Sequence, residues 1–96
     1  MYMKKYDTDG QLIVAVCDKN IVGKKFREGK LVLRLDEGFY KGEDVWEEEV
    51  REALSCATIA NIAGKKSIAC AVECGCIDPD NIIFIEGIPH AQMVKI

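Results

Sequence analysis

The segment Gln11–Cys17 constrains the fold of this chain more than any other, because its interior is a continuous apolar run. A short run without polar positions suits a strand that is buried on both faces. Asp9-Gly10, just before the run, is a strong hairpin signal. The pattern therefore predicts a hairpin whose edge strand is Met1–Tyr6, where large and charged residues alternate.

Two further elements are expected after the buried run. Asp18-Lys19-Asn20 can cap a short helix over Ile21–Arg27, which Gly29 would end. In the following segment, 31–35, leucine alternates with other residues. This alternation predicts a half-buried strand.

The clearest predicted element is a helix between Asp44 and Gly64. Asp44 followed three residues later by Glu47 is a capping-box signature, and further acidic residues favour the positive end of the helix dipole. Apolar residues then recur at helical spacing, and the second half of the segment is apolar almost all round. A second helix is expected over 66–74, with Gly75 as its left-handed cap.

Strands over 82–86 and 91–96 are expected to close the chain, with a turn at 78–81 and a kink at 87–89 between these elements. The order segregates strands from helices. We therefore expect a single domain over residues 1–96 with an α+β fold. Its core would be a small mixed or antiparallel sheet of about five strands, with two main helices packed on one face.

Composition excludes several classes of protein. With 49% hydrophobic and 30% charged residues the chain has the balance of a soluble globular protein, and no apolar run approaches the roughly 18 residues of a membrane span. The five cysteines are odd in number and lie in regularly patterned apolar stretches. This usage fits a reducing compartment rather than a secreted disulfide framework. We expect a cytoplasmic protein with no membrane partner.

The net charge of −3 conceals a strong asymmetry. Residues 1–35 hold eight Lys or Arg against four acidic residues, whereas residues 36–58 hold eight acidic residues against two basic ones. An acidic domain is a poor generic binder of polyanions, yet the first segment can still form a local basic face. The alternative is that both segments serve only solubility.

Two segments place cations beside aromatic residues. Lys24 precedes Phe26, and Tyr40-Lys41 lies in a short polar loop. Single-stranded RNA is recognised by this combination, because aromatic rings stack on bases while cations neutralise phosphates. The competing interpretation is that the phenylalanines belong to the core and the lysines are solvated.

Three polar residues in apolar surroundings are candidates for a site. His90 and Gln92 would project from the same face of a strand, and together they can orient a ligand. Asn61 needs hydrogen-bond partners if it lies in an apolar face, so it is either a structural clamp or a site residue. A lone histidine is more often structural, and no nucleophile has a spacing that pairs it with His90.

A cysteine-based centre is the remaining candidate. Cys70 and Cys74 are four residues apart, Cys76 follows closely, and Cys56 or His90 would have to complete a tetrahedral zinc site. Only one pair has a suitable spacing, and the intervening residues are apolar. We therefore expect core cysteines, with no metal and no cofactor.

Five motifs occur in order along the chain: Val16-Cys17-Asp18, Gly23-Lys24-Lys25-Phe26, Phe39-Tyr40-Lys41-Gly42, Ala57-Thr58-Ile59-Ala60-Asn61 with Gly64, and Ile88-Pro89-His90-Ala91-Gln92. They resemble a small archaeal family known as domain of unknown function 424. The resemblance implies an archaeal cytosolic protein of about this length without an established activity. It also implies that Asn61, Gly64, His90 and Gln92 occupy motif positions, whereas the cysteines at 70, 74 and 76 depart from the small or aliphatic residues expected there.

The leading hypothesis is a noncatalytic binding module for RNA or a ribonucleoprotein, associated with translation or information processing. One alternative is a small enzyme that uses His90 as its acid or base. A second is a cysteine-based zinc or redox protein. The residues expected to share one binding surface are Asp18, Lys24, Tyr40, Lys41, Asn61, His90 and Gln92.

Overall fold

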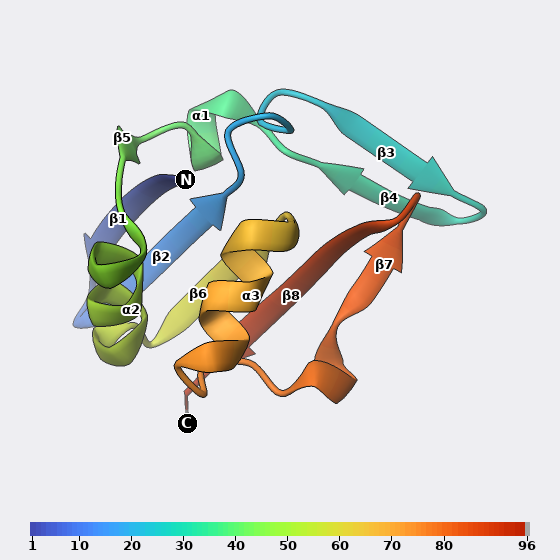
Figure 1. The fold of residues 1–96 in the computed structure, drawn as a ribbon. Helices are drawn as coiled ribbons and strands as arrows, with labels where there is room; N and C mark the ends of the chain where they lie inside the picture. Colours follow the sequence, from blue (N-terminus) through green and yellow to red (C-terminus); the bar gives the residue numbers. More distant parts are fainter. Residues whose placement is uncertain (96) are drawn as a thin grey trace.

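The chain folds around a six-stranded mixed sheet with the strand order β5-β1-β2-β6-β8-β7 (Figure 1). A separate antiparallel hairpin is formed by β3 and β4. The computed structural model describes residues 1–95, and within them no helix has the length and apolar character needed to cross a membrane. The elements are β1 (Tyr2–Thr8), β2 (Gln11–Cys17), β3 (Lys25–Glu28), β4 (Leu31–Arg34), α1 (Glu37–Tyr40), β5 (Glu43–Asp44), α2 (Glu47–Cys56), β6 (Ile59–Ala63), α3 (Lys65–Glu73), a 3₁₀ turn (Pro79–Asn81), β7 (Ile83–Ile85) and β8 (Ile88–Val94).

The predicted N-terminal hairpin is confirmed, but its first strand extends to Thr8 and is not an edge strand, because β5 pairs with it. β1 and β2 pair antiparallel through all seven residues, from Thr8 opposite Gln11 to Tyr2 opposite Cys17. Asp9 and Gly10 both have positive φ, 48° and 76°, which is the backbone of a two-residue hairpin turn that matches strand twist. The second half of β2 is completely buried, as expected for a strand covered on both faces.

The prediction of a helix between Asp44 and Gly64 is correct for its first half and wrong for its second. α2 ends at Cys56, and the next segment is strand β6, which pairs parallel with β2 and antiparallel with β8. A short segment that is apolar on all sides suits either a buried helix or a buried central strand, so periodicity cannot separate them. The start differs too, because Asp44 lies in β5, while Glu49 Oε1 accepts the Trp46 N–H at 3.2 Å as the helix begins.

The short helix expected over Ile21–Arg27 is also wrong. Gly23 has a φ of +81°, outside the helical region, and the chain then enters strand β3. The Gly23 N–H donates to the Leu35 carbonyl at 2.6 Å, and the Leu35 N–H donates to the Lys24 carbonyl at 2.9 Å. These bonds close the root of hairpin β3–β4, in which the expected strand over 31–35 is the second arm.

The C-terminal half agrees more closely with expectation. α3 occupies the predicted second helix, and Gly75 has a φ of +78° at its end. The Gly75 N–H donates to the Val72 carbonyl and the Cys76 N–H to the Ala71 carbonyl, both at 3.0 Å, which is the Schellman pattern. Strands β7 and β8 follow, although β8 begins before the expected kink is complete. Ile96, the last residue of the expected final strand, lies outside the described residues.

The buried residues form two clusters, one on each side of the sheet. In the first, Val14 and Val16 of β2 pack with Leu54 of α2 and with residues of α3. The second contains the alternate residues, Ala15 and Cys17, together with residues of hairpin β3–β4 and α1. The fold is therefore mixed α/β, with a six-stranded main sheet, a separate two-stranded hairpin and three helices, rather than a sheet of about five strands with two helices. The helices are not confined to one face.

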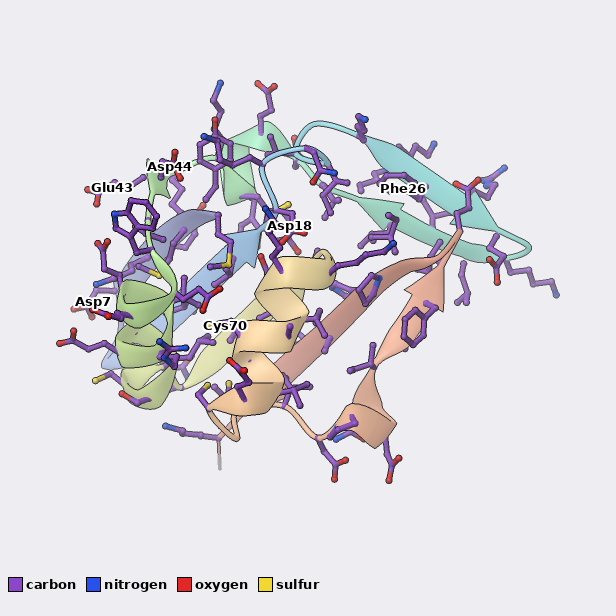
Figure 2. All side chains as sticks on the ribbon, in the orientation of Figure 1. Asp7, Asp18, Phe26, Glu43, Asp44 and Cys70 are labelled. Carbon is purple, nitrogen blue, oxygen red and sulfur yellow. The ribbon has the colours of Figure 1, made fainter. Side chains whose placement is uncertain are left out.

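The carboxylate of Asp18 joins the end of β2 to the start of α3 (Figure 2). Asp18 Oδ1 accepts hydrogen bonds from Ser67 N at 2.8 Å and Ser67 Oγ at 2.7 Å, and Oδ2 accepts from Lys66 N at 3.0 Å. These donors are at the positive end of α3, where a carboxylate is favoured. Gly64 is needed beside them, because its φ is +105° and a Cβ there would lie 2.7 Å from Asp18 Oδ1.

We expect Gly64→Ala to lower the free energy of unfolding by about 3 kcal/mol, since it combines backbone strain with a clash against Asp18. Gly75→Ala is the matched control. Gly75 also has a positive φ, +78°, but a Cβ there meets nothing within 4 Å, so this change should cost only about 1–2 kcal/mol. Urea unfolding followed by circular dichroism measures both. Equal losses in the two variants would contradict the role given to Asp18.

Candidate functional site

The side of the sheet opposite α2 and α3 brings three of the predicted site residues together. The register places Asn61 of β6 opposite Gln92 of β8, and Ala63 opposite His90. Because alternate residues of a strand share a face, Asn61, His90 and Gln92 all project to the same side. It is the side of Ala15, which the register places beside Asn61. In Figure 1 this side is turned away from the viewer, behind α2 and α3.

Only one end of this side is well covered. The second buried cluster covers the end that holds Cys17 and Ala63. In the same cross-strand row, toward β7, His90 is half-buried and Ile83 is 50% exposed. Farther along the strands Asn61 is half-buried, Gln92 is exposed and Val94 is 60% exposed. We call the exposed part of this side the open patch. It consists of Ile59, Asn61, Ile83, His90, Gln92 and Val94.

The polar side chains of the open patch have free hydrogen-bonding groups. No hydrogen bond joins the side chains of Asn61, His90 or Gln92 to any other residue in the described range 1–95. Burial lowers the pKa of His90 below its ordinary value of 6.5. The imidazole is therefore neutral at pH 7, so it has one donor and one acceptor nitrogen. The patch offers donors and acceptors but carries no formal charge.

Two other predicted site residues are not at the surface. Asp18 is 8% exposed, and its carboxylate is occupied by the start of α3. Tyr40 is 5% exposed, and burial together with the neighbouring Cys17 thiol raises the pKa of its hydroxyl to about 12. Lys24 and Lys41 are both exposed. Lys24 directly precedes β3 and Lys41 directly follows Tyr40 of α1, and both elements contribute residues to the second cluster.

Lys24 belongs to a group of cations whose proximity was not predicted from the sequence. It lines an open surface hollow of about 590 Å³ together with Lys25, Arg34, Asp36 and Glu37. The helix expected over Ile21–Arg27 hid this arrangement, because a helix would have spread the basic residues around its axis. The available signal was the alternation Lys25-Phe26-Arg27, which is strand-like. We call Lys24, Lys25, Arg27, Lys30 and Arg34 the basic hairpin.

The register of hairpin β3–β4 directs its cations outward. Lys25 is opposite Arg34, and both are exposed, whereas the next pair, Phe26 and Leu33, packs against the second cluster. Figure 2 shows Phe26 on the hairpin, which extends beyond the edge of the main sheet. Among residues 1–95, the ion pairs join Asp44 to the N-terminal amine and to Lys19, and Arg51 to two glutamates. None of them includes a cation of the basic hairpin.

Two reciprocal hydrogen bonds hold the far end of the hairpin against the turn between β7 and β8. Glu86 Oε2 accepts the Arg27 N–H at 2.9 Å, and Glu28 Oε1 accepts the Glu86 N–H at 2.9 Å. Glu28 is the one acidic residue within 24–34. β7 also contributes Ile83 to the open patch, opposite His90. The basic hairpin and the open patch are therefore neighbours.

The cysteines are dispersed between core and surface. Cys17 and Cys70 are buried, Cys76 is half-buried, and Cys56 and Cys74 are exposed. Within residues 1–95, no three cysteine, histidine or carboxylate side chains come close enough together to hold a metal ion. Cys74 and Cys76 instead line a cavity of about 340 Å³ with Met93 and Lys95.

Comparison with known proteins agrees with the motifs. The model of DUF424, a family described as a protein of unknown function, matches residues 6–96. The chain belongs to this family. A crystal structure of an uncharacterized conserved protein from Methanopyrus kandleri is similar, with a TM-score of 0.79 and 24% sequence identity over 96% of this chain and 88% of the other. That likeness supports the fold alone. No curated protein matches, so family membership brings no activity with it.

We expect the stability of the protein to depend on His90 below neutral pH. The pKa of His90 is lower in the folded than in the unfolded chain. As the pH falls, His90 therefore binds a proton in the unfolded chain before it does so in the folded chain. The contribution of neutral His90 to stability is complete above pH 6.5 and is lost as the pH falls through the pKa of His90 in the folded chain. Between about pH 7.5 and 5, urea unfolding should show a smaller loss of unfolding free energy for His90→Gln than for the wild type. If the unfolding free energies of the two proteins fall in parallel as the pH is lowered, the prediction is wrong.

Alkylation should separate the cysteines by exposure. Cys56 and Cys74 should react first in the native protein, since both are exposed. Cys17 should stay unmodified until the chain unfolds, because burial raises the pKa of its thiol to about 12 and excludes the reagent. Mass spectrometry after iodoacetamide treatment, with and without urea, measures this order. Native modification of Cys17 would show that the second cluster opens readily.

Proposed function

We propose that this protein is a noncatalytic RNA-binding module whose basic hairpin holds the phosphates of the RNA. The observation that carries the proposal is the set of five exposed cations on β3–β4 that form no ion pair with another residue in the range 1–95. RNA phosphates supply the opposite charges, and the release of their counterions favours binding.

The distribution of charge supports a dedicated surface rather than general solubility. Solubility is served by interspersed charges of both signs. Here the chain is acidic overall, with a net charge of −3, yet five cations and one acidic residue fall within residues 24–34. The acidic residue, Glu28, is turned to the β7–β8 turn by its hydrogen bond to Glu86 N. Lys25, Arg27 and Arg34 are therefore left on the outward side of the hairpin, and Asp36 and Glu37 line the hollow beside them.

The shape of the hairpin also suits an extended strand of nucleic acid. It projects from the body of the protein (Figure 1), so a chain can pass along it without meeting the acidic helix α2. Val32, opposite Arg27, lies on the same face of the hairpin as Lys25 and Arg34 and is 40% exposed. It offers an apolar contact to sugars and bases beside the phosphates.

The alternative of an enzyme using His90 has weaker support. A half-buried neutral histidine suits proton transfer near neutral pH. A catalytic histidine is normally oriented by a hydrogen bond to its second nitrogen, and among residues 1–95 the side chain of His90 has none. We therefore assign His90 to binding rather than to catalysis.

The test is binding of a labelled single-stranded RNA of mixed sequence over a series of salt concentrations. If all five cations neutralise phosphates, the logarithm of the association constant should fall with the logarithm of salt with a slope of about −3.5. Lys25→Glu and Arg34→Glu should each weaken binding and make the slope less steep by about 0.7.

Lys5→Glu is the matched control, because Lys5 is exposed on β1 and the change in net charge is the same. It should leave the slope unchanged. Absence of binding at low salt, or an equal effect of Lys5→Glu, would reject the proposal.

A further inference from the structure

Resting on the proposed RNA binding, we propose that the open patch reads the bases of the same single strand. In this arrangement the amides of Asn61 and Gln92 and the imidazole of His90 hydrogen-bond to the edge of an unpaired base. The phosphates on either side of that base lie on the basic hairpin.

The register of the sheet makes the three polar groups one receptor. Asn61 and Gln92 are direct partners on adjacent strands, and His90 lies two residues before Gln92 on the same face. Directly opposed side chains have Cβ atoms about 4.5–5.5 Å apart. Two amides at that separation present several donors and acceptors to one planar group. An amide side chain can pair with a base edge through one donor and one acceptor.

The apolar members of the patch suit the faces of a base. Ile83 and Val94 flank the polar residues and are 50% and 60% exposed. On the β1 side, Tyr6 projects to the same face, because the register pairs it with Ile13 and Ile13 with Ile59. The Tyr6 ring stacks on Phe39 with 5.3 Å between centroids and 11° between planes. Aromatic and apolar surfaces of this kind support unstacked bases in single-stranded RNA.

The charges separate base recognition from phosphate recognition. The open patch contains no lysine, arginine or carboxylate, so it has no charged group to pair with a phosphate. The basic hairpin adjoins it through β7, because Glu86 holds the hairpin and Ile83 belongs to the patch. A polyanion with apolar, hydrogen-bonding bases is complementary to both surfaces at once.

The unused hydrogen bonds support this role. In residues 1–95 no protein group pairs with the side chains of Asn61, His90 or Gln92, although Asn61 and His90 are half-buried. Within residues 1–95 no side-chain polar atom is buried without a partner. The unused groups of the open patch are therefore open to solvent and available to a ligand. Burial also keeps the imidazole neutral, and so able to donate and accept.

The experiment compares four labelled homopolymeric RNA octamers, of A, C, G and U, at one salt concentration. The wild type should bind its preferred octamer about tenfold more tightly than the weakest, which is the discrimination expected of one well-formed base contact. Asn61→Ala and Gln92→Ala should each bring the four affinities to within about twofold of one another, while the salt slope stays unchanged.

Gln11→Ala is the matched control, because it removes an exposed amide at the start of β2, away from the patch. It should retain the base preference. Circular dichroism and urea unfolding check that each variant is folded. Gln92 is exposed, so its variant tests the inference even if Asn61→Ala destabilises the sheet.

The outcomes separate the two proposals. If none of the four octamers binds, both the RNA-binding function and the base-reading inference fail. If Lys25→Glu and Arg34→Glu reduce the salt slope but the wild type shows no base preference, only the inference fails. Retention of the preference in Gln92→Ala, or equal binding of a duplex of the same length, also rejects the inference and leaves the function standing.

Discussion

The three hydrogen bonds that the Asp18 carboxylate accepts from the start of α3 determine how the two halves of the chain meet. Asp18 directly follows β2, and Gly64 directly follows β6, so this contact fixes two parallel strands at the same end of the sheet. The Asp18 N–H also donates to the Ala63 carbonyl at 3.1 Å. Because the carboxylate is held at the positive end of a helix dipole, its negative charge is stabilised inside the protein.

The position of α3 then decides what each side of the sheet can do. Once α3 and α2 cover one side, the alternate residues of β6 and β8 must lie on the other. Asn61, His90 and Gln92 are among these residues. The second side receives only α1 and the β3–β4 hairpin as cover, and these pack near its upper end. The open patch is therefore a consequence of where the helices begin, rather than of any local signal in the strands.

The sequence predicted elements whose signals are local and missed those that depend on distant contacts. The Asp9-Gly10 turn and the Gly75 helix end are set by positive φ angles, which glycine signals directly. Strand β6 lacks such a signal, because its apolar composition fits a buried helix equally well until β2 and β8 pair with it. For the site, the link between His90 and Gln92 followed from strand spacing. Asn61 joined them only through β6, and the outward cations of the hairpin appeared only once Lys25 was placed opposite Arg34.

The two hydrogen bonds that the carboxylates of Glu28 and Glu86 accept at the tip of the hairpin affect the kinetics and the entropy of binding. A basic segment that is disordered when free loses conformational entropy when it folds on a nucleic acid. Here both ends of the hairpin are fixed, at the root by Gly23 and Leu35 and at the tip by the two carboxylates. A partner therefore meets a preformed charge array, and less of the interaction free energy is lost to ordering the protein.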